Sequence, residues 1–251
     1  MKIEDVKTIA VLGAGTMGHG IAQTIAGAGY NVIMRSRRKE TLESGLERIK
    51  KSLQKFTEKG KISQEESEKL LSRITTTADL EKAAKDADVI IETIVEDMET
   101  KKGLFKEVDK ISKREAVLAS NTSTLSITEI ASATDRPEKV VGMHFSNPVA
   151  LTRPIEIIRG VLTSDDTVEL IKSIALKVDK TPIVVKDSPG FASSRLGIAL
   201  FLEACKMLEE GVEWFGETPI HIINISAALP VCNLPDSENY PIGGRIFDTG
   251  S

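Results

Sequence analysis

Three glycines near the amino terminus have the spacing of a phosphate-binding turn. Gly13, Gly15 and Gly18 form the pattern GxGxxG, with Thr16 and Met17 between the second and third glycine. Glycine permits a tight turn and a close approach of the backbone to a pyrophosphate, and the amino terminus of a following helix attracts phosphate charge. Because a strand-like run precedes the turn and a helical stretch follows it, these five residues are predicted to bind a dinucleotide.

A basic segment further along the chain bears on which dinucleotide is bound. An acidic side chain about 20 residues after the glycines, at the end of the second strand, would hydrogen-bond the 2′-hydroxyl of NAD. This chain has Ser36 there, followed by Arg37 and Arg38. A small hydroxyl with two guanidinium groups suits a 2′-phosphate. We therefore expect NADP(H) in preference to NAD(H); the alternative is a solvated basic turn in an enzyme that uses NAD.

Polar side chains also follow other apolar runs of the sequence. They occupy residues 120–124, 142–148 and 187–191, and Glu156 stands twelve residues after His144. Ligands of an open α/β sheet bind outside the carboxyl ends of its strands, so residues that follow strands are the candidates for chemistry. We expect all these segments to meet at that edge.

Alternating strand and helix patterns must position these segments. Strand-like runs occur at 6–12, 31–34, 89–95, 116–120, 140–144, 155–158 and 182–185. Helical stretches separate them, which predicts a Rossmann-type, mostly parallel α/β sheet over residues 1–186. Residues 40–59 have the period of a long amphipathic helix that Gly60 ends, and Ser63 with Glu66 forms a capping box for a second helix. An inserted helix pair is therefore expected between the second and third of these strand-like runs.

The chain changes character after the sheet. Residues 187–211 have a helical period, so we predict a smaller all-helical domain over 187–251. Residues 212–251 are atypical, because they lack lysine and contain four of the nine prolines, a composition that disfavours helices. This tail is expected to be either a genuine replacement for helices or a reading-frame artefact that shortens the domain.

Composition excludes several classes of protein. The 251 residues carry a formal net charge of −4, whereas a nucleic-acid-binding protein is normally basic. No run approaches the ~18 apolar residues that a membrane span needs. The amino terminus has no apolar signal-peptide core, and the two cysteines allow at most one disulfide. We expect a cytoplasmic protein with no metal, nucleic-acid or membrane site.

Five motifs in one order resemble those of the 3-hydroxyacyl-CoA dehydrogenases, the 3-hydroxybutyryl-CoA dehydrogenases included. The motifs are GAGTMGHG, SNTSTLSI, GMHFSNPV, IEIIRG and DSPGF, and the similarity runs from about Lys7 to Gly211. The resemblance implies hydride transfer between C3 of a 3-hydroxyacyl-CoA and a nicotinamide cofactor. It makes His144 the general base for the hydroxyl proton, a role that suits imidazole near neutral pH, and Glu156 the carboxylate that orients it.

The resemblance also assigns ligand contacts. It implies that Ser123 touches both the cofactor and the substrate oxygen, and that Glu96, Lys101 and Asn147 touch the cofactor. For Glu96 and Lys101, the alternative is an exposed start of a helix.

Two residues of the long predicted helix match positions that contact the CoA moiety in the family. They are Ser52 and Lys59, seven residues apart and therefore on one helix face; the alternative is a solvated face. These residues favour an acyl-CoA substrate over the free hydroxy acid that a related dehydrogenase would oxidise, and the resemblance implies a short acyl chain. A third alternative is a catalytically weak protein that binds a dinucleotide or CoA.

The sequence departs from the family at one expected site residue. The family's asparagine that holds the substrate oxygen is Ser194 here. A serine is shorter and offers a single donor, so we predict a lower rate of the same reaction from the set His144, Glu156, Ser123 and Ser194. The family is homodimeric through helices that the atypical tail would have to supply, so the sequence leaves the oligomeric state open.

Overall fold

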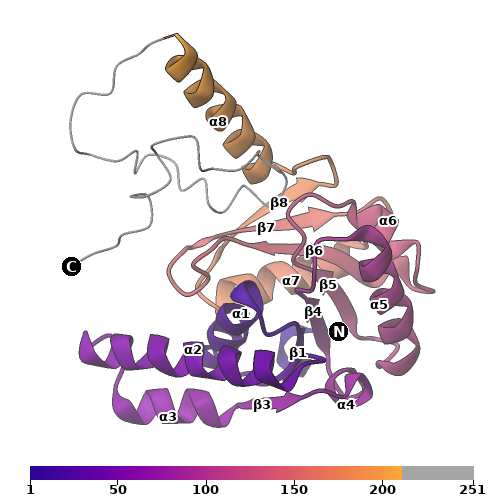
Figure 1. The fold of residues 1–251 in the computed structure, drawn as a ribbon. Coiled ribbons are helices and arrows are strands. Elements are labelled where there is room, and N and C mark those ends of the chain that lie inside the picture. Colours follow the sequence, from indigo (N-terminus) through magenta and orange to yellow (C-terminus); the bar gives the residue numbers. More distant parts are fainter. Residues whose placement is uncertain (211–251) are drawn as a thin grey trace. The chain divides into compact units, whose positions relative to one another are not determined.

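An eight-stranded sheet forms the centre of the first unit of the computed structural model, which describes residues 1–210 (Figure 1). In spatial order the strands are β3 (Ile74–Thr77), β2 (Asn31–Arg35), β1 (Thr8–Leu12), β4 (Val89–Glu92), β5 (Val117–Ser120), β6 (Val140–Phe145), β7 (Pro154–Arg159) and β8 (Thr181–Lys186). The α-helices are α1 (Thr16–Gly27), α2 (Lys39–Glu58), α3 (Gln64–Ser72), α4 (Leu80–Ala84), α5 (Met98–Ile111), α6 (Ile127–Ala131), α7 (Asp165–Lys177) and α8 (Ser193–Glu209). This order confirms the predicted Rossmann-type sheet.

Strand direction changes once across the sheet. All neighbouring strands are parallel except β6 and β7, which are antiparallel. The connection between them is residues 146–153, whereas a parallel crossover needs a dozen or more residues. The short connection therefore forces β7 to run back beside β6.

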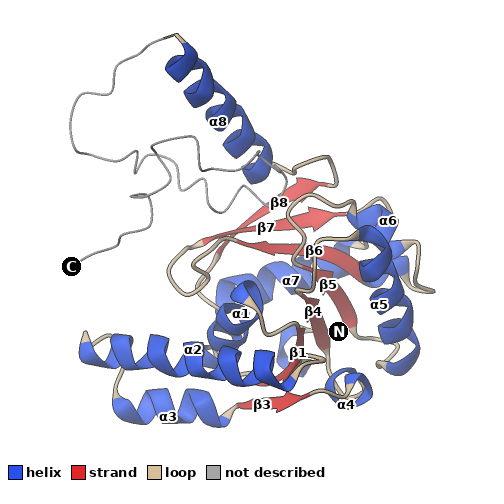
Figure 2. Cartoon of the chain, viewed as in Figure 1, coloured by secondary structure: helices blue, strands red, loops and turns tan. Residues whose placement is uncertain are grey.

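Helices cover both faces of the sheet (Figure 2). Because side chains alternate along a strand, Ile9 and Val11 of β1 join one apolar core, and Ala10 and Leu12 join another. The first core takes its helical residues mainly from α1, α2 and α7, and the second from α4, α5 and α6. Strands buried on both faces explain the near-continuous apolar runs of the sequence.

The inserted helix pair forms as predicted and contacts the glycine-rich turn. Ser63 and Glu66 make the capping box of α3, and Gly60 follows α2 with a φ of +65°. Gly45 of α2 faces the turn so closely that a Cβ there would lie 2.8 Å from the carbonyl oxygen of Ala14. The absence of a side chain at Gly45 thus sets the distance between α2 and the turn.

Three elements of the first unit differ from the sequence expectations. β3 and α4 were not predicted, and the strand expected at 89–95 ends at Glu92. β3 buries only Ile74 and leaves its middle threonines exposed, so it lacks an apolar run. After Glu92 the chain leaves the sheet, since the amide of Ile94 turns back to the Glu92 carboxylate.

The chain divides into two compact units, residues 1–192 and 193–251. The described part of the second unit is the single helix α8. The predicted departure from helical structure over 212–251 lies outside the described residues. Among residues 1–210, no helix has the length and apolar character to cross a membrane.

Candidate active site

The glycine-rich turn joins β1 to α1, and two of its glycines are required by close contacts. Gly13 has a φ of +128°, and a Cβ on it would overlap Thr93. A Cβ on Gly18 would overlap the carbonyl of Gly13. A Cβ on Gly15 would instead meet no atom within 4 Å. The turn is therefore packed on its inner side and open at Gly15, beside the amino terminus of α1, a geometry that fits a dinucleotide pyrophosphate.

The predicted 2′-phosphate segment follows β2, the neighbour of β1. Ser36 is half-buried and its Oγ accepts the amide of Arg38 at 3.4 Å, while the Arg37 and Arg38 side chains are exposed. Arg35 lies close to Arg37, and burial followed by the Arg37 charge lowers the pKa of its guanidinium. This run of cations is thus concentrated at the end of β2.

His144 and Glu156 are directly opposite each other on the antiparallel strands β6 and β7. The Nδ1 of His144 lies 2.8 Å from the Oε2 of Glu156. The other carboxylate oxygen accepts the backbone N–H of Ala192 at 2.9 Å. Both side chains are largely buried, with 11% and 5% of their surface exposed. The structure therefore brings His144 and Glu156 together and holds the carboxylate at both oxygens.

Two further residues support this pair, one against the His144 ring and one at the strand residue that follows it. Both lie in segments singled out from the sequence, but neither was assigned a role there. The ring of Phe191 lies 6.1 Å from that of His144, centre to centre. The side-chain oxygen of Asn121, which follows β5, accepts the amide of Phe145 at 2.9 Å. Asn121 thus ties the segment after β5 to the end of the strand that carries His144.

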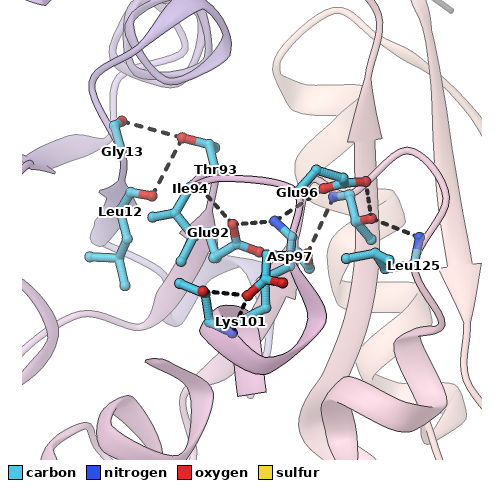
Figure 3. A network of polar contacts seen from close by, with 12 residues as sticks. Leu12, Gly13, Glu92, Thr93, Ile94, Glu96, Asp97, Lys101 and Leu125 are labelled. Atoms are coloured by element: carbon cyan, nitrogen blue, oxygen red, sulfur yellow. Dashed lines mark hydrogen bonds and ion pairs between the residues drawn. The ribbon is translucent and has the colours of Figure 1, made fainter. Parts of the chain in front are cut away.

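A network of charged side chains joins the end of β4 to the start of α5 (Figure 3). The Nζ of Lys101 lies 2.6 Å from the Oε1 of Glu92 and 3.3 Å from the Oε2 of Glu96. The Oε1 of Glu96 accepts the amide of Ser123 at 2.8 Å and the hydroxyl of Thr122 at 2.5 Å. The structure therefore brings Glu96, Lys101 and Ser123 together, although only 1% of the Lys101 side chain is exposed.

The pKa values of the two carboxyls in this network are shifted in opposite directions. Burial raises the pKa of Glu92, and its hydrogen bonds and Lys101 do not compensate fully. Burial also acts on Glu96, but the hydrogen bond from Thr122, the charge of Lys101 and the Ser123 amide outweigh it and lower its pKa. Glu96 is therefore held as an anion beside Ser123.

The remaining predicted residues lie in separate places. Ser52 is half-buried within α2, and Lys59 is exposed at its end. Asn147 is exposed and is the second residue after β6. Ser194 belongs to α8 of the second unit, which is described by itself.

The expectation that residues 187–191 follow a strand at the same edge as His144 is wrong at its start. β8 runs opposite to β6, so Asp187 follows the end of β8 that lies nearest the beginning of β6. Its carboxylate accepts the Ser126 hydroxyl and the Thr128 amide, each at 2.8 Å. Asp187 therefore holds the start of α6, and it is Phe191 and Ala192, further along the chain, that contact the histidine pair. Residues 1–210 hold no cluster of acidic, histidine or cysteine side chains arranged for a metal ion.

Comparisons with known proteins identify the family of this chain. A family model described as the NAD binding domain of 3-hydroxyacyl-CoA dehydrogenase matches residues 8–188. The chain is 45% identical over 208 residues to the probable 3-hydroxybutyryl-CoA dehydrogenase of Bacillus subtilis, covering 83% of this chain and 72% of that protein. These matches confirm the resemblance drawn from the five motifs.

Solved structures give the same result. The crystal structure of (S)-3-hydroxybutyryl-CoA dehydrogenase from Ralstonia eutropha superposes with a TM-score of 0.80 at 35% identity, over 83% of this chain and 74% of that one. A dehydrogenase of 5-formyl-3-hydroxy-2-methylpyridine 4-carboxylic acid superposes with a TM-score of 0.75 at 29% identity, over 83% and 67% of the two chains. The fold thus also occurs in an enzyme named for a free acid.

Proposed function

Because this chain belongs to the 3-hydroxyacyl-CoA dehydrogenase family, we propose that it interconverts a short-chain (S)-3-hydroxyacyl-CoA and the 3-ketoacyl-CoA. 3-Hydroxybutyryl-CoA and acetoacetyl-CoA are the substrates that its relatives' names suggest. The observation that carries the proposal is the 2.8 Å contact between His144 and Glu156. This contact supplies what the oxidation of an alcohol requires of the protein, a base held in one orientation.

The proton transfer follows from the hydrogen bonds of the pair. An ionised carboxylate only accepts hydrogen bonds, so Glu156 holds the hydrogen on Nδ1 of His144. The Nε2 atom then carries the lone pair and takes the proton of the substrate hydroxyl. Glu156 also stabilises the imidazolium that results, while its second oxygen stays on the Ala192 amide. In the reducing direction His144 returns the proton to the ketone oxygen.

The nicotinamide cofactor, when bound, accepts or supplies the hydride at C3 of the substrate. The residues proposed to hold it are Gly13, Gly15, Thr16, Met17, Gly18, Ser36, Arg37, Arg38, Glu96, Lys101, Ser123 and Asn147. The open side of the turn at Gly15 supports the pyrophosphate position. Glu96 supports a role for Ser123 by accepting its amide, because this bond fixes the backbone that carries the hydroxyl.

NADP(H) is the cofactor that the end of β2 favours. Residues 35–39 combine four cationic side chains with Ser36 and include no carboxylate. The two exposed arginines leave their guanidinium groups available to a 2′-phosphate. Ser52 and Lys59 on α2 are proposed to contact the CoA moiety, and Ser194 to hold the substrate oxygen. A cytoplasmic location and the two-domain boundary at residue 186 stay predictions.

The test is the initial rate of acetoacetyl-CoA reduction, measured with NADPH and NADH in parallel on protein of verified mass and monodispersity. Turnover that prefers NADPH supports the reaction and the cofactor assignment. Turnover that prefers NADH retains the reaction and rejects NADP(H). Reduction of free acetoacetate at a rate that CoA does not change would instead favour a free hydroxy acid as substrate. Dinucleotide binding without turnover would identify a catalytically weak binding protein.

A further inference from the structure

The turn that carries Ser123 obtains its shape from side chains rather than from the sheet. The four amides of residues 122–125 all donate to side-chain oxygens: Thr122 to the Oγ of Ser120, Ser123 to Glu96, and Thr124 and Leu125 to the Oγ1 of Thr122. Their donor–acceptor distances are 2.8 to 3.3 Å. The position of Ser123 therefore depends on what orients these acceptors.

Two carboxylates orient every one of these acceptors. The hydroxyl of Ser120 donates to Glu92 at 2.6 Å, and that of Thr122 donates to Glu96 at 2.5 Å. Because Thr122 Oγ1 gives its hydrogen to Glu96, its lone pairs face the amides of Thr124 and Leu125. The turn is thus held by hydrogen bonds to Glu92 at one end and to Glu96 at the other.

Lys101 links the two carboxylates. It bonds Glu92 at 2.6 Å and Glu96 at 3.3 Å, while the side chains of Glu92 and Lys101 are each 1% exposed (Figure 3). Glu92 is fixed in turn by the amide of Ile94 at 2.6 Å. A buried ion pair is weak evidence for stability, because its desolvation offsets most of the attraction. Its use in this molecule is better explained by the orientation that it imposes on Glu96.

We propose that Glu92, which the proposed reaction does not otherwise involve, is a positioning residue for Ser123. Through Lys101 it holds the Glu96 carboxylate against the turn of residues 122–125, and through Ser120 it holds the start of that turn. The proposal rests on the proposed function only for the role of Ser123 at the substrate. The physical link from Glu92 to the turn can be measured without any turnover.

The experiment is a double-mutant cycle with the full chain, using Glu92→Gln, Lys101→Met and the two combined. Hydrogen exchange of the peptide that contains residues 121–125 is the first readout, and kcat per folded protein is the second. Asp109→Asn is the matched control, because Asp109 is a carboxylate of α5 that is 5% exposed and forms an ion pair with the buried Arg136 at 2.6 Å. It is hydrogen-bonded to the amide of Asp135 rather than to the Ser123 turn.

We expect each single variant to speed exchange in residues 121–125 and to lower kcat by about 10- to 100-fold, the loss that a misplaced site residue causes. The combined variant should be no worse than the more affected single variant, since the Lys101 link is one of the two links through which Glu92 acts. The control should lower the melting temperature but leave the exchange of this peptide and kcat unchanged.

The proposal is overturned if residues 121–125 exchange as slowly in the Glu92→Gln variant as in the wild type. It is also overturned if the effects of the two substitutions are additive, or if Asp109→Asn speeds hydrogen exchange in the same peptide. It is also overturned if exchange rises while kcat stays constant. A wild-type protein that reduces no acyl-CoA would reject the proposed function instead. The exchange cycle would then still decide whether Glu92 holds the turn.

Discussion

Two buried glutamates occupy equivalent positions in the two parts of the sheet. Glu92 stands in register with Ser120 on parallel strands, and Glu156 with His144 on antiparallel ones. Each receives one backbone amide, from Ile94 or Ala192, and one side-chain donor from the neighbouring strand.

The difference lies in the basic partner. Glu92 holds Lys101, whose side chain is 1% exposed, whereas Glu156 holds His144, which is 11% exposed. The Lys101 ammonium is enclosed by the protein, whereas the His144 imidazole is partly accessible to a substrate. On the proposed roles, the same arrangement positions a turn in the parallel part and supplies the base in the antiparallel part.

The largest effect should come from removing the imidazole. His144→Gln should lower kcat by about 10²- to 10⁴-fold, the usual contribution of general acid–base catalysis. Dinucleotide affinity, measured by fluorescence titration, should change little because the binding turn lies in the parallel part. Equal losses in dinucleotide affinity and kcat would show that cofactor binding and catalysis are not divided between the two parts of the sheet.

Glu156→Gln tests the carboxylate of the same pair. We expect kcat to fall by about 10- to 100-fold, because the amide group no longer holds the hydrogen on Nδ1 or stabilises the imidazolium. The pH dependence of kcat should shift as well, which a loss of folded protein would not cause. An unchanged pH profile would assign Glu156 to structure alone.

Ser36→Asp addresses the parallel part only. A carboxylate at the end of β2 should repel a 2′-phosphate and accept a ribose hydroxyl, so the ratio of kcat/KM for NADPH to that for NADH should fall roughly tenfold. The kcat at saturating cofactor should stay constant, and Ser52→Ala serves as a control for the cofactor ratio. A ratio that does not move would show that this segment is a solvated basic turn.

The smallest effect concerns the stability that Glu96 contributes. Its pKa is lowered on folding, so its contribution is complete above the pKa of about 4.3 of an unfolded glutamate and declines as the pH falls through the folded value. At pH 7, Glu96→Gln should reduce the free energy of unfolding by about 1–3 kcal/mol. Urea titrations at pH 7 and pH 3 should show this difference shrinking in acid. A constant difference would mean that the carboxylate charge is not what stabilises the turn.

The sequence predicted the parts of the site that have a local pattern. The glycine-rich turn, the helix pair and the capping box each depend on residues within one short segment, so spacing alone identified them. The pairing of His144 with Glu156 also followed, through a family resemblance rather than through periodicity. The short segment 146–153 could have predicted that β7 is antiparallel, because it has no room for a crossover helix.

Other parts of the site depend on contacts between distant segments. Glu92 lies in an apolar run that predicts a longer strand. A charged residue inside such a run is the signal that could have identified it. No sequence pattern around Asn121 indicates that its side chain accepts the amide of Phe145, 24 residues away. The role of Lys101 required its burial, which the helical period alone does not indicate.

The contact between Gly45 and Ala14 limits how this fold can be rearranged. In sequence, α2 and α3 form a separate inserted segment that recombination could move between nucleotide-binding domains. A Cβ added at position 45 would lie only 2.8 Å from the Ala14 carbonyl oxygen, so the helix pair and the turn have complementary surfaces. A transplanted pair with any larger residue at position 45 would displace the turn or stand away from it. The two segments are therefore expected to be inherited together, as one evolutionary unit.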